Sequence, residues 1–340
     1  MLAYAQIQEE VRLYANSLGC CGLGFTSLQS SPYAEYLHHW FETQQYGEMT
    51  YLARQPEMRM DPQKRFPWVK SVLMIAFPYG EEAVSTSDSS PLVARYARSQ
   101  DYHSLLEQKL KKIRQFLDRY FPQAQFRAYV DTGPIMEREL AQNAGLGFIG
   151  KNTLLIHRHQ GSYFFLATLL TDISFQVDRP IDTSHCGTCT RCLDVCPTQA
   201  LTPYQMDARK CISYLTIEKK GDLTPTEMEG LENQYFGCDL CQEVCPFNRR
   251  PFPFSSELKT PHPLASLTWE QILLLDEKTF EFLKPKSPLR RSKQAGLLRN
   301  AIVVLANLKE VRYFKDVVSH SRSLLPGVAS AVDYFKKKFS

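Results

Sequence analysis

The chain has 340 residues, 44% of them hydrophobic and 22% charged, which is the composition of a water-soluble protein of about two domains. Its formal net charge of +4 is too small to indicate a nucleic-acid partner by itself. No window reaches the roughly eighteen apolar residues of a membrane span, and Glu9, Glu10 and Arg12 interrupt the place of a signal-peptide core. Ten cysteines in such a chain favour metal binding over disulfides, so we expect a soluble, cytoplasmic protein.

The first 180 residues mix helical and strand patterns. Apolar side chains at a spacing of three to four predict amphipathic helices over residues 3–18 and His103–Tyr120. A polar loop is predicted over Ser85–Pro91. The predicted strands are Ser71–Phe77, Phe126–Val130, and a hairpin around Gly161 that joins Asn152–Ile156 to Tyr163–Leu170. We therefore expect an α+β protein whose residues 1–180 form an α/β domain.

Residue Asp131 lies between a predicted strand and a predicted helix that runs to Gly145. Gly133 can serve as the N-cap of this helix, and Pro134 fits its first position. The carboxylate would then lie at a strand end, where ligands gather in α/β folds. It could equally be a structural carboxylate that interacts with the free N–H groups of the helix start. The residues alone leave both interpretations open.

The stretch Gly145–Asn152 matches G-x-G-x-x-G and nearly matches the P-loop motif. Both phosphate-binding motifs need a strand before the glycines and a helix after them, whereas here the predicted order is reversed. Asn152 also stands where a P-loop has Ser or Thr. We therefore expect these glycines to end a helix and to allow a close approach of the backbone.

Residues 181–250 hold the strongest pattern in the chain. Cys186–Pro197 reads C-x2-C-x2-C-x3-C-P, the run with which bacterial ferredoxin-type proteins bind iron–sulfur clusters. Cys238–Pro246 repeats it without the leading cysteine, and Cys211 is the one cysteine between the two runs. The fourth thiolate of such a run ligates the neighbouring cluster. The predicted ligands are Cys186, Cys189, Cys192 and Cys245 for one [4Fe–4S] cluster, and Cys196, Cys211, Cys238 and Cys241 for the other.

Zinc and disulfides are the alternatives to iron–sulfur clusters. Paired C-x2-C spacings can hold zinc, but a zinc site has no use for the C-x3-C-P tails or for a ligand exchanged between two runs. A cytoplasmic setting disfavours disulfides. Two cubane clusters are therefore predicted.

The remaining residues, 251–340, are predicted to be a linker followed by helices. Five prolines between Pro246 and Pro263 prevent a continuous helix. Helical spacing returns in Ala295–Leu308 and in a last helix over Pro326–Phe339. The segment 284–299 carries six Lys or Arg and no acidic residue, which is typical of a solvated face but could also neutralise phosphates.

Together these motifs resemble the epoxyqueuosine reductases, cobalamin-dependent iron–sulfur enzymes of queuosine synthesis in tRNA. The resemblance covers most of residues 55–250. The matching segments are Asp101–His103, Val130–Gly133, Ala144–Phe148 with Lys151–Asn152, the cluster runs, Cys211–Thr216 and Tyr235–Cys241. Longer members of the family end in HEAT-like repeats, whereas here only Gln294–Glu310 looks like part of one.

The resemblance implies a cobalamin in the N-terminal domain, near the clusters, in a fold similar to the core of reductive dehalogenases. Asp131 falls on the family's proposed proton donor, and Arg138 on a position that faces the tRNA. Leu106 replaces the glycine of the D-x-H-x-x-G signature, which fits a cobalt without a protein histidine. The cofactor-binding residues implied are Arg59, Asp101, His103, Asp131, Lys151 and Asn152.

The implied reaction is a two-electron reductive deoxygenation of epoxyqueuosine to queuosine in tRNA. Electrons from an external one-electron donor would pass through the clusters to cob(II)alamin, and Asp131, kept protonated by burial against the cofactor, would protonate the leaving oxygen. We expect a monomer. A dehalogenase-like enzyme acting on a small molecule is one alternative. A ferredoxin-type electron carrier is the other, and it would leave most of the chain without a role.

Overall fold

The computed structural model describes residues 4–79, 90–252 and 255–340. Its N-terminal part is built on a four-stranded sheet with the order β1 (Gly22–Thr26), β2 (Ser71–Pro78), β7 (Phe164–Thr171) and β4 (Phe126–Tyr129). All three pairs of neighbouring strands are antiparallel. The α+β class is thus confirmed, but the α/β arrangement expected for residues 1–180 is wrong, since such folds are built on parallel strands.

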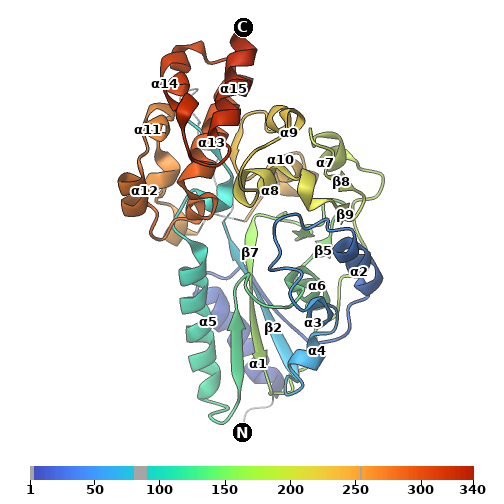
Figure 1. Ribbon diagram of the computed structural model, residues 1–340. Coiled ribbons are helices and arrows are strands. Elements are labelled where there is room, and N and C mark those ends of the chain that lie inside the picture. The colour runs from blue at the N-terminus through green and yellow to red at the C-terminus, as the bar shows by residue number, and fades with distance from the viewer. Residues whose placement is uncertain (1–3, 80–89, 253–254) are drawn as a thin grey trace.

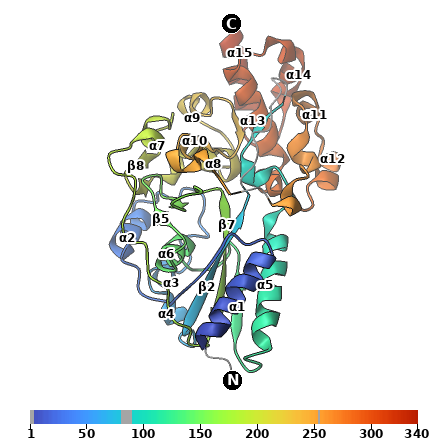
Figure 2. The ribbon, with the colours of Figure 1, turned by 180° about the vertical axis from the view of Figure 1, so that it is seen from behind.

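Helices cover both faces of this sheet. α1 (Tyr4–Ser17) and α5 (Tyr102–Asp118) lie on one face, and α6 (Glu137–Asn143) lies on the other (Figures 1 and 2). Because all eight residues of β2 are buried, its side chains alternate between two cores. Leu73, Ile75 and Phe77 face α1 and α5, whereas Val72, Met74 and Ala76 face α6.

Two predicted elements differ in the structure. The hairpin around Gly161 is reduced to a single bridge between His157 and Gly161, and β6 (Leu155–Ile156) pairs with β5 (Phe148–Ile149). The reason is that β7 is an interior strand, whose two edges are taken by β2 and β4. Helix α6 begins at Glu137 instead of Pro134. The predicted polar loop 85–91 lies mostly outside the described residues.

Short elements surround the sheet and form the cluster segment, residues 181–250. Near the sheet are α2 (Ala34–Glu42), α3 (Pro56–Met60), α4 (Pro62–Arg65) and β3 (Leu92–Val93). The cluster segment contains α7 (Arg191–Asp194), β8 (Leu201–Thr202), β9 (Gln205–Met206), α8 (Ile212–Ile217), α9 (Pro225–Gly230), β10 (Gln234–Phe236) and α10 (Leu240–Glu243). β10 pairs in parallel with β3, which fastens this segment to the N-terminal part.

The C-terminal part is helical, as predicted. It contains α11 (Trp269–Leu273), α12 (Glu277–Leu283), α13 (Lys293–Asn307), α14 (Phe314–Ser319) and α15 (Val328–Phe339). α13 packs beside α15, and its residues 297–306 are all buried (Figure 1). No helix within the described ranges has both the length and the apolar character that crossing a membrane requires.

One hydrophobic core joins the cluster segment to the C-terminal helices. It runs from Val93 through Leu215 and Phe236 to Phe335 and so crosses the expected boundary at residue 250. Two buried polar side chains of α13 reinforce it. Arg299 donates hydrogen bonds to the carbonyls of Leu215, Lys219 and Gly221, and Asn300 donates to those of Thr216 and Tyr235. The three-part division at residues 180 and 250 stays a prediction.

Candidate active site and cluster ligands

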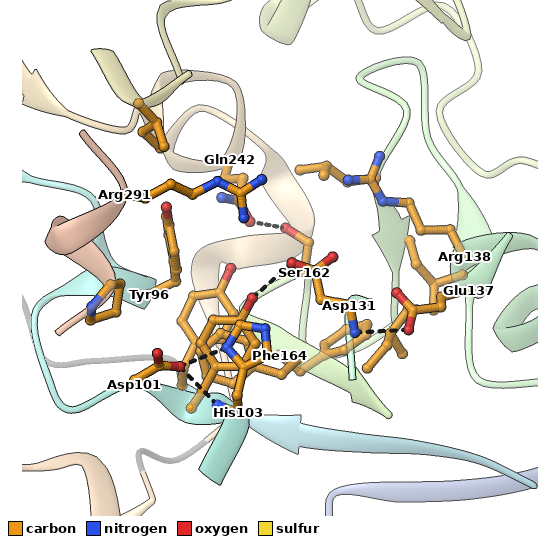
Figure 3. A pocket seen from close by; sticks show the side chains of 18 of the residues that line it. Tyr96, Asp101, His103, Asp131, Glu137, Arg138, Ser162, Phe164, Gln242 and Arg291 are labelled. Carbon is orange, nitrogen blue, oxygen red and sulfur yellow. Dashed lines mark hydrogen bonds and ion pairs between the residues drawn. The ribbon is translucent and has the colours of Figure 1, made fainter. Parts of the chain in front are cut away.

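A cavity of about 610 Å³ lies where the sheet, the cluster segment and the start of the C-terminal helices meet. Its walls come from the start of α5, the loop after β4, strand β7, helix α10 and the residues just before α13 (Figure 3). Four of the residues predicted to bind cofactor or substrate line it, namely Asp101, His103, Asp131 and Arg138. Segments far apart in sequence thus build one site.

Residue Asp131 is held at both its side chain and its backbone. Its Oδ2 atom accepts a hydrogen bond from the Tyr102 hydroxyl at 3.0 Å, and its N–H donates to Glu137 Oε1 at 3.0 Å. Its φ angle of +56° is uncommon for a residue other than glycine. In the part of the chain that the structure describes, no N–H of α6 donates to this carboxylate. The helix-start interpretation is therefore wrong, and the side chain is exposed to the cavity.

Glu137 is the second carboxyl group at this place, and Figure 3 shows it beside Asp131. Burial raises the pKa of Glu137 to about 7, and the nearby charge of Asp131 adds to the effect. Arg138, the next residue, is exposed and donates from Nη1 to the Thr153 carbonyl at 2.9 Å. Glu137 is therefore a group whose protonation changes near neutral pH.

On another wall, Asp101 connects three elements. It is the N-cap of α5 and accepts hydrogen bonds from the His103 backbone at 3.1 Å and from Arg290 Nη2 at 2.8 Å. Burial opposes its ionisation, but these bonds, the His103 side chain and the Arg290 charge outweigh burial and lower the pKa of Asp101. Its bond to His103 Nδ1, 2.6 Å long, raises the pKa of that imidazole. His103 also stacks on Tyr102, with ring centroids 4.3 Å apart.

Arg59 lies behind the Asp131 loop, outside the cavity lining. Its Nη1 donates to the Gly133 carbonyl at 3.3 Å. Its Nε atom is buried and has no hydrogen-bond partner among the described residues. Burial lowers the pKa of the Arg59 guanidinium. A buried donor without a partner is rare in folded proteins, so it points to an acceptor that the protein does not supply.

Lys151 and Asn152 contact the cluster loops and do not line the cavity. Lys151 Nζ donates to the carbonyls of Gly187 at 2.7 Å and Cys189 at 3.0 Å. Asn152 is 1% exposed, and its Nδ2 donates to the Cys241 carbonyl at 3.4 Å. The two side chains thus join the turn after β5 to both cysteine runs.

All ten cysteines are free thiols, and the eight predicted ligands are partly buried. Burial raises the pKa of Cys192 to about 11, and the neighbouring thiols Cys186, Cys245 and Cys189 contribute. The tail cysteine of the second run, Cys245, therefore lies beside the three leading cysteines of the first run. The exchange of ligands that the two C-x3-C-P tails predict stays a prediction.

The other four predicted ligands, Cys196, Cys211, Cys238 and Cys241, also lie near one another. Burial raises the pKa of Cys238 to about 12, and Cys211 and Cys196 are among the nearby thiols that contribute. Cys241 has a raised pKa for the same reason, with Cys238 as its strongest neighbour. Within the described ranges, no three His, Cys, Asp or Glu side chains converge on a single ion position. A cubane distributes its ligands over four iron atoms, so its cysteines need not converge in this way.

Sequence reasoning missed a polar network between the cavity and the cluster segment. Ser162 and Gln242 line the cavity, and the Ser162 hydroxyl donates to Gln242 Oε1 at 2.9 Å. Asn248 Nδ2 donates to Ser162 Oγ at 3.1 Å and to the Gln242 carbonyl at 2.7 Å. Tyr102 and Glu137 were missed as well. Tyr102 lies between Asp101 and His103 in the matching segment, and that position is the sequence signal that points to it.

Comparison with known proteins decides the family. A model described as "Epoxyqueuosine reductase QueG, DUF1730" matches residues 59–132, and one described as "4Fe-4S double cluster binding domain" matches residues 185–248. The epoxyqueuosine reductase of Pseudomonas aeruginosa is 37% identical over 311 residues, which cover 89% of this chain and 86% of that protein. That of Leadbetterella byssophila is 39% identical over 309 residues, covering 89% and 98%.

This chain belongs to the epoxyqueuosine reductase family. It is accordingly an oxidoreductase, and the predicted family is confirmed. A crystal structure of a selenomethionine-labelled epoxyqueuosine reductase superposes with a TM-score of 0.89 at 29% identity, covering 99% of this chain and 92% of that one. An epoxyqueuosine reductase with an epoxyqueuosine-modified tRNA-Tyr stem loop gives 0.88 at 29% identity, covering 99% and 91%. The fold of these reductases therefore matches 99% of this chain.

Proposed function

We propose that this protein reduces epoxyqueuosine to queuosine in tRNA, with electrons supplied through two [4Fe–4S] clusters to cobalamin. The observation that carries the proposal is the position of Asp131 in a cavity of about 610 Å³ that the cluster segment closes on one side. A related enzyme was crystallised with a tRNA stem loop that carries epoxyqueuosine. Reduction takes up two electrons and two protons and releases the epoxide oxygen as water.

The residues around the cavity fit a cobalamin. Tyr102 stacks on Phe165 with ring centroids 4.1 Å apart, which gives the cavity a flat aromatic wall. The unpartnered Nε of Arg59 behind the Asp131 loop is a donor suited to an amide or phosphate of the cofactor. Asp101 and His103 would complete its surroundings. Cobalamin, when bound, supplies a cobalt centre that accepts single electrons and reduces the carbon–oxygen bond.

Asp131 is proposed as the general acid. The Tyr102 hydroxyl fixes Oδ2, which leaves Oδ1 free to face a substrate in the cavity. An epoxide oxygen that leaves as an alkoxide needs a proton as the bond breaks, and a positioned carboxylic acid can donate it. The carboxyl is exposed in the protein alone, so the burial that would keep it protonated must come from cofactor and substrate. In one related structure the catalytic aspartate loop is described as swung out of the active site, and we propose that the Asp131 loop can move likewise.

The ligand sets proposed for the two clusters are Cys186, Cys189, Cys192 and Cys245, and Cys196, Cys211, Cys238 and Cys241. Lys151 and Asn152 support this assignment, since they hold the carbonyl groups of both cysteine runs in place. The network of Ser162, Gln242 and Asn248 then offers a short bonded connection between the second run and the cavity. A one-electron carrier outside the protein would reduce the clusters.

Contacts to tRNA are proposed for Arg138 and for the basic segment 284–299. A second cavity of about 550 Å³ lies beside this segment and is lined by several of its cations. Arg290 is paired with Asp101, and Arg291 with Glu218, so these two are partly neutralised. Lys286 and Lys293 are exposed and form no ion pair with a described residue, which leaves them available for phosphates. We further propose that α13 and α15 act as a HEAT-like pair in a cytoplasmic monomer.

The proposed function is tested with anaerobically reconstituted protein, cobalamin, a low-potential electron donor and tRNA that carries epoxyqueuosine. Mass spectrometry of the digested nucleosides should show queuosine, formed only when cobalamin is present. A reconstituted enzyme that leaves epoxyqueuosine unchanged under these conditions would contradict the proposal. Reduction of an aryl halide in place of the tRNA would point to a dehalogenase-like enzyme.

A further inference from the structure

The loop that carries Asp131 has few contacts of its own. Asp131 has a φ angle of +56°, a left-handed backbone conformation that is uncommon outside glycine and that surrounding contacts must support. Three contacts from other residues are available for this purpose. They are the Tyr102 hydroxyl on Oδ2, the Glu137 carboxylate on the Asp131 N–H, and Arg59 on the Gly133 carbonyl.

Of these three contacts, only that of Glu137 acts on the backbone of Asp131 itself. Glu137 is the first residue of α6 and therefore belongs to a fixed element. The helix is fixed because Leu140 and Ala141 are 4% and 0% exposed and pack in the core beneath the sheet. The hydrogen bond of 3.0 Å from the Asp131 N–H to Glu137 Oε1 thus connects a packed helix to a loop with an uncommon backbone conformation.

We propose that Glu137 is a positioning residue. By accepting the hydrogen bond of the Asp131 N–H, it latches the Asp131 loop in the conformation in which the Asp131 carboxyl lines the cavity. The inference rests on the proposed function of Asp131 as the acid. Without an acceptor at this point, residue 131 can return to a common backbone conformation, and its carboxyl then leaves the Tyr102 hydroxyl and the cavity. As a positioning residue, Glu137 does not touch the reacting atoms.

The charges around Glu137 suit such a latch. Asp131, Arg138 and Arg59 are the charged groups that face it, one acid and two bases. Burial raises the pKa of Glu137 to about 7, so a fraction of the molecules carries a neutral Glu137 at physiological pH. A neutral glutamic acid still accepts the amide through its carbonyl oxygen, and it no longer repels the Asp131 carboxylate. The hydrogen bond, not the charge, is therefore the feature that matters.

Two substitutions separate the hydrogen bond from the charge. Glu137→Gln keeps an oxygen acceptor at the same place, whereas Glu137→Leu removes it. Glu139, two positions further on in α6, is a matched control because its carboxylate accepts from the Ser31 hydroxyl at 2.5 Å and does not contact Asp131. Glu139→Leu removes a carboxylate of α6 that does not contact Asp131 and leaves the Glu137 latch in place.

The first readout is hydrogen exchange at the Asp131 amide in the reconstituted holoprotein. Glu137→Leu should exchange roughly two- to tenfold faster than wild type, the scale of one net hydrogen bond, while Glu137→Gln and Glu139→Leu retain protection. In turnover assays, Glu137→Leu should lose kcat on the order of 10- to 100-fold with an unchanged KM for tRNA, since the acid is misplaced and binding is not. Glu137→Gln should restore most of the activity.

Unchanged exchange at residue 131 in Glu137→Leu would overturn the proposal. So would equal losses of kcat in Glu137→Gln and Glu137→Leu, because the charge would then be the decisive property. Failure of the wild-type protein to reduce epoxyqueuosine would instead contradict the proposed function. The exchange result would stand apart from that outcome, since it depends only on the contact between Glu137 and the amide.

Discussion

Arg290 Nη2 donates a hydrogen bond to Asp101 Oδ2 at 2.8 Å, across 189 positions of the sequence. Asp101 starts α5, and Arg290 belongs to the segment that leads into α13, so this ion pair connects two walls of the same cavity. Part of the basic segment 284–299 is therefore occupied by contacts within the protein. A test of tRNA binding by this segment should therefore use its exposed Lys or Arg residues that form no ion pair with a described residue.

Lys286 and Lys293 are those cations. Replacing both by Gln should lower the slope of log affinity against log salt by up to about 0.9 for each phosphate that is no longer neutralised, with no effect on either cluster. The measurement is tRNA binding at several salt concentrations. The matched control is Lys111→Gln with Lys112→Gln, on the exposed side of α5. If the slope stays the same, the basic segment is only a solvated face.

The ligand exchange proposed between the cysteine runs predicts that a substitution in one run damages the cluster built mainly on the other. Cys245→Ser should disturb the cluster built on Cys186, Cys189 and Cys192, and Cys196→Ser should disturb the one built on Cys238 and Cys241. Iron analysis and EPR spectroscopy of the reduced protein check both outcomes. Cys21→Ser, outside both runs, should leave the spectra unchanged. Effects confined to the local run would show that the ligand sets are wrong.

Asp131→Asn should lower turnover by about 10²-fold or more, which is the usual scale for the loss of a general acid. The amide can still accept the Tyr102 hydrogen bond, so the loop should keep its place and both clusters should remain. Single-turnover rates, cobalt and iron contents and tRNA affinity check this prediction. Asp118→Asn, at the far end of α5, is the control. A variant with normal turnover and lower thermal stability would assign Asp131 a structural role.

Glu137 should also make stability depend on pH. Its folded-state pKa is raised from 4.5 to about 7, so the folded protein binds the proton more tightly than the unfolded chain. The resulting stabilisation is fully present below about pH 4.5 and is lost as the pH rises through about 7. Glu137→Gln should remove this decline. The melting temperature of the variant minus that of the wild type should therefore rise as the pH increases towards 8. Parallel curves across this range would count against the raised pKa.

Arg299 should be among the most sensitive positions for stability. It is 1% exposed and donates to three backbone carbonyls of the cluster segment, and burial lowers the pKa of its guanidinium to about 10. Arg299→Met would leave these carbonyls without partners and should cost about 3 kcal/mol or more. Denaturant unfolding measures the loss. Arg322→Met, at an exposed position, should be nearly neutral.

How far the sequence predicts this protein depends on how local each feature is. The cysteine runs could be recognised because each places several cysteines within a dozen residues. Strand β2 could be recognised because its apolar run is continuous. The pairing of β7 with β2 and β4 could not, since it depends on partners nearly a hundred and about forty residues away in sequence. The same holds for Arg290 at Asp101.

The loop after β4 shows a different limit. Gly133 and Pro134 form a good start for a helix, yet the helix begins at Glu137. The difference arises because Glu137 accepts the amide of Asp131 and Arg59 holds the Gly133 carbonyl, which keeps the residues between them out of the helix. Sequence patterns weigh propensities, whereas a functional loop is shaped by its contacts.

The core shared by the cluster segment and α13 limits where genes of this family can recombine and still encode a folded protein. Bacterial two-cluster ferredoxins carry a similar cysteine pattern. Here Arg299 and Asn300 of α13 donate hydrogen bonds to the carbonyls of Leu215, Thr216 and Tyr235. Without α13, this side of the cluster segment would expose unpaired carbonyls and apolar side chains. A recombination crossover between residues 250 and 290 would separate the two parts that share this core. Hybrids formed in this way should be poorly folded and should be lost by selection. Helices added beyond α15 would leave that core intact.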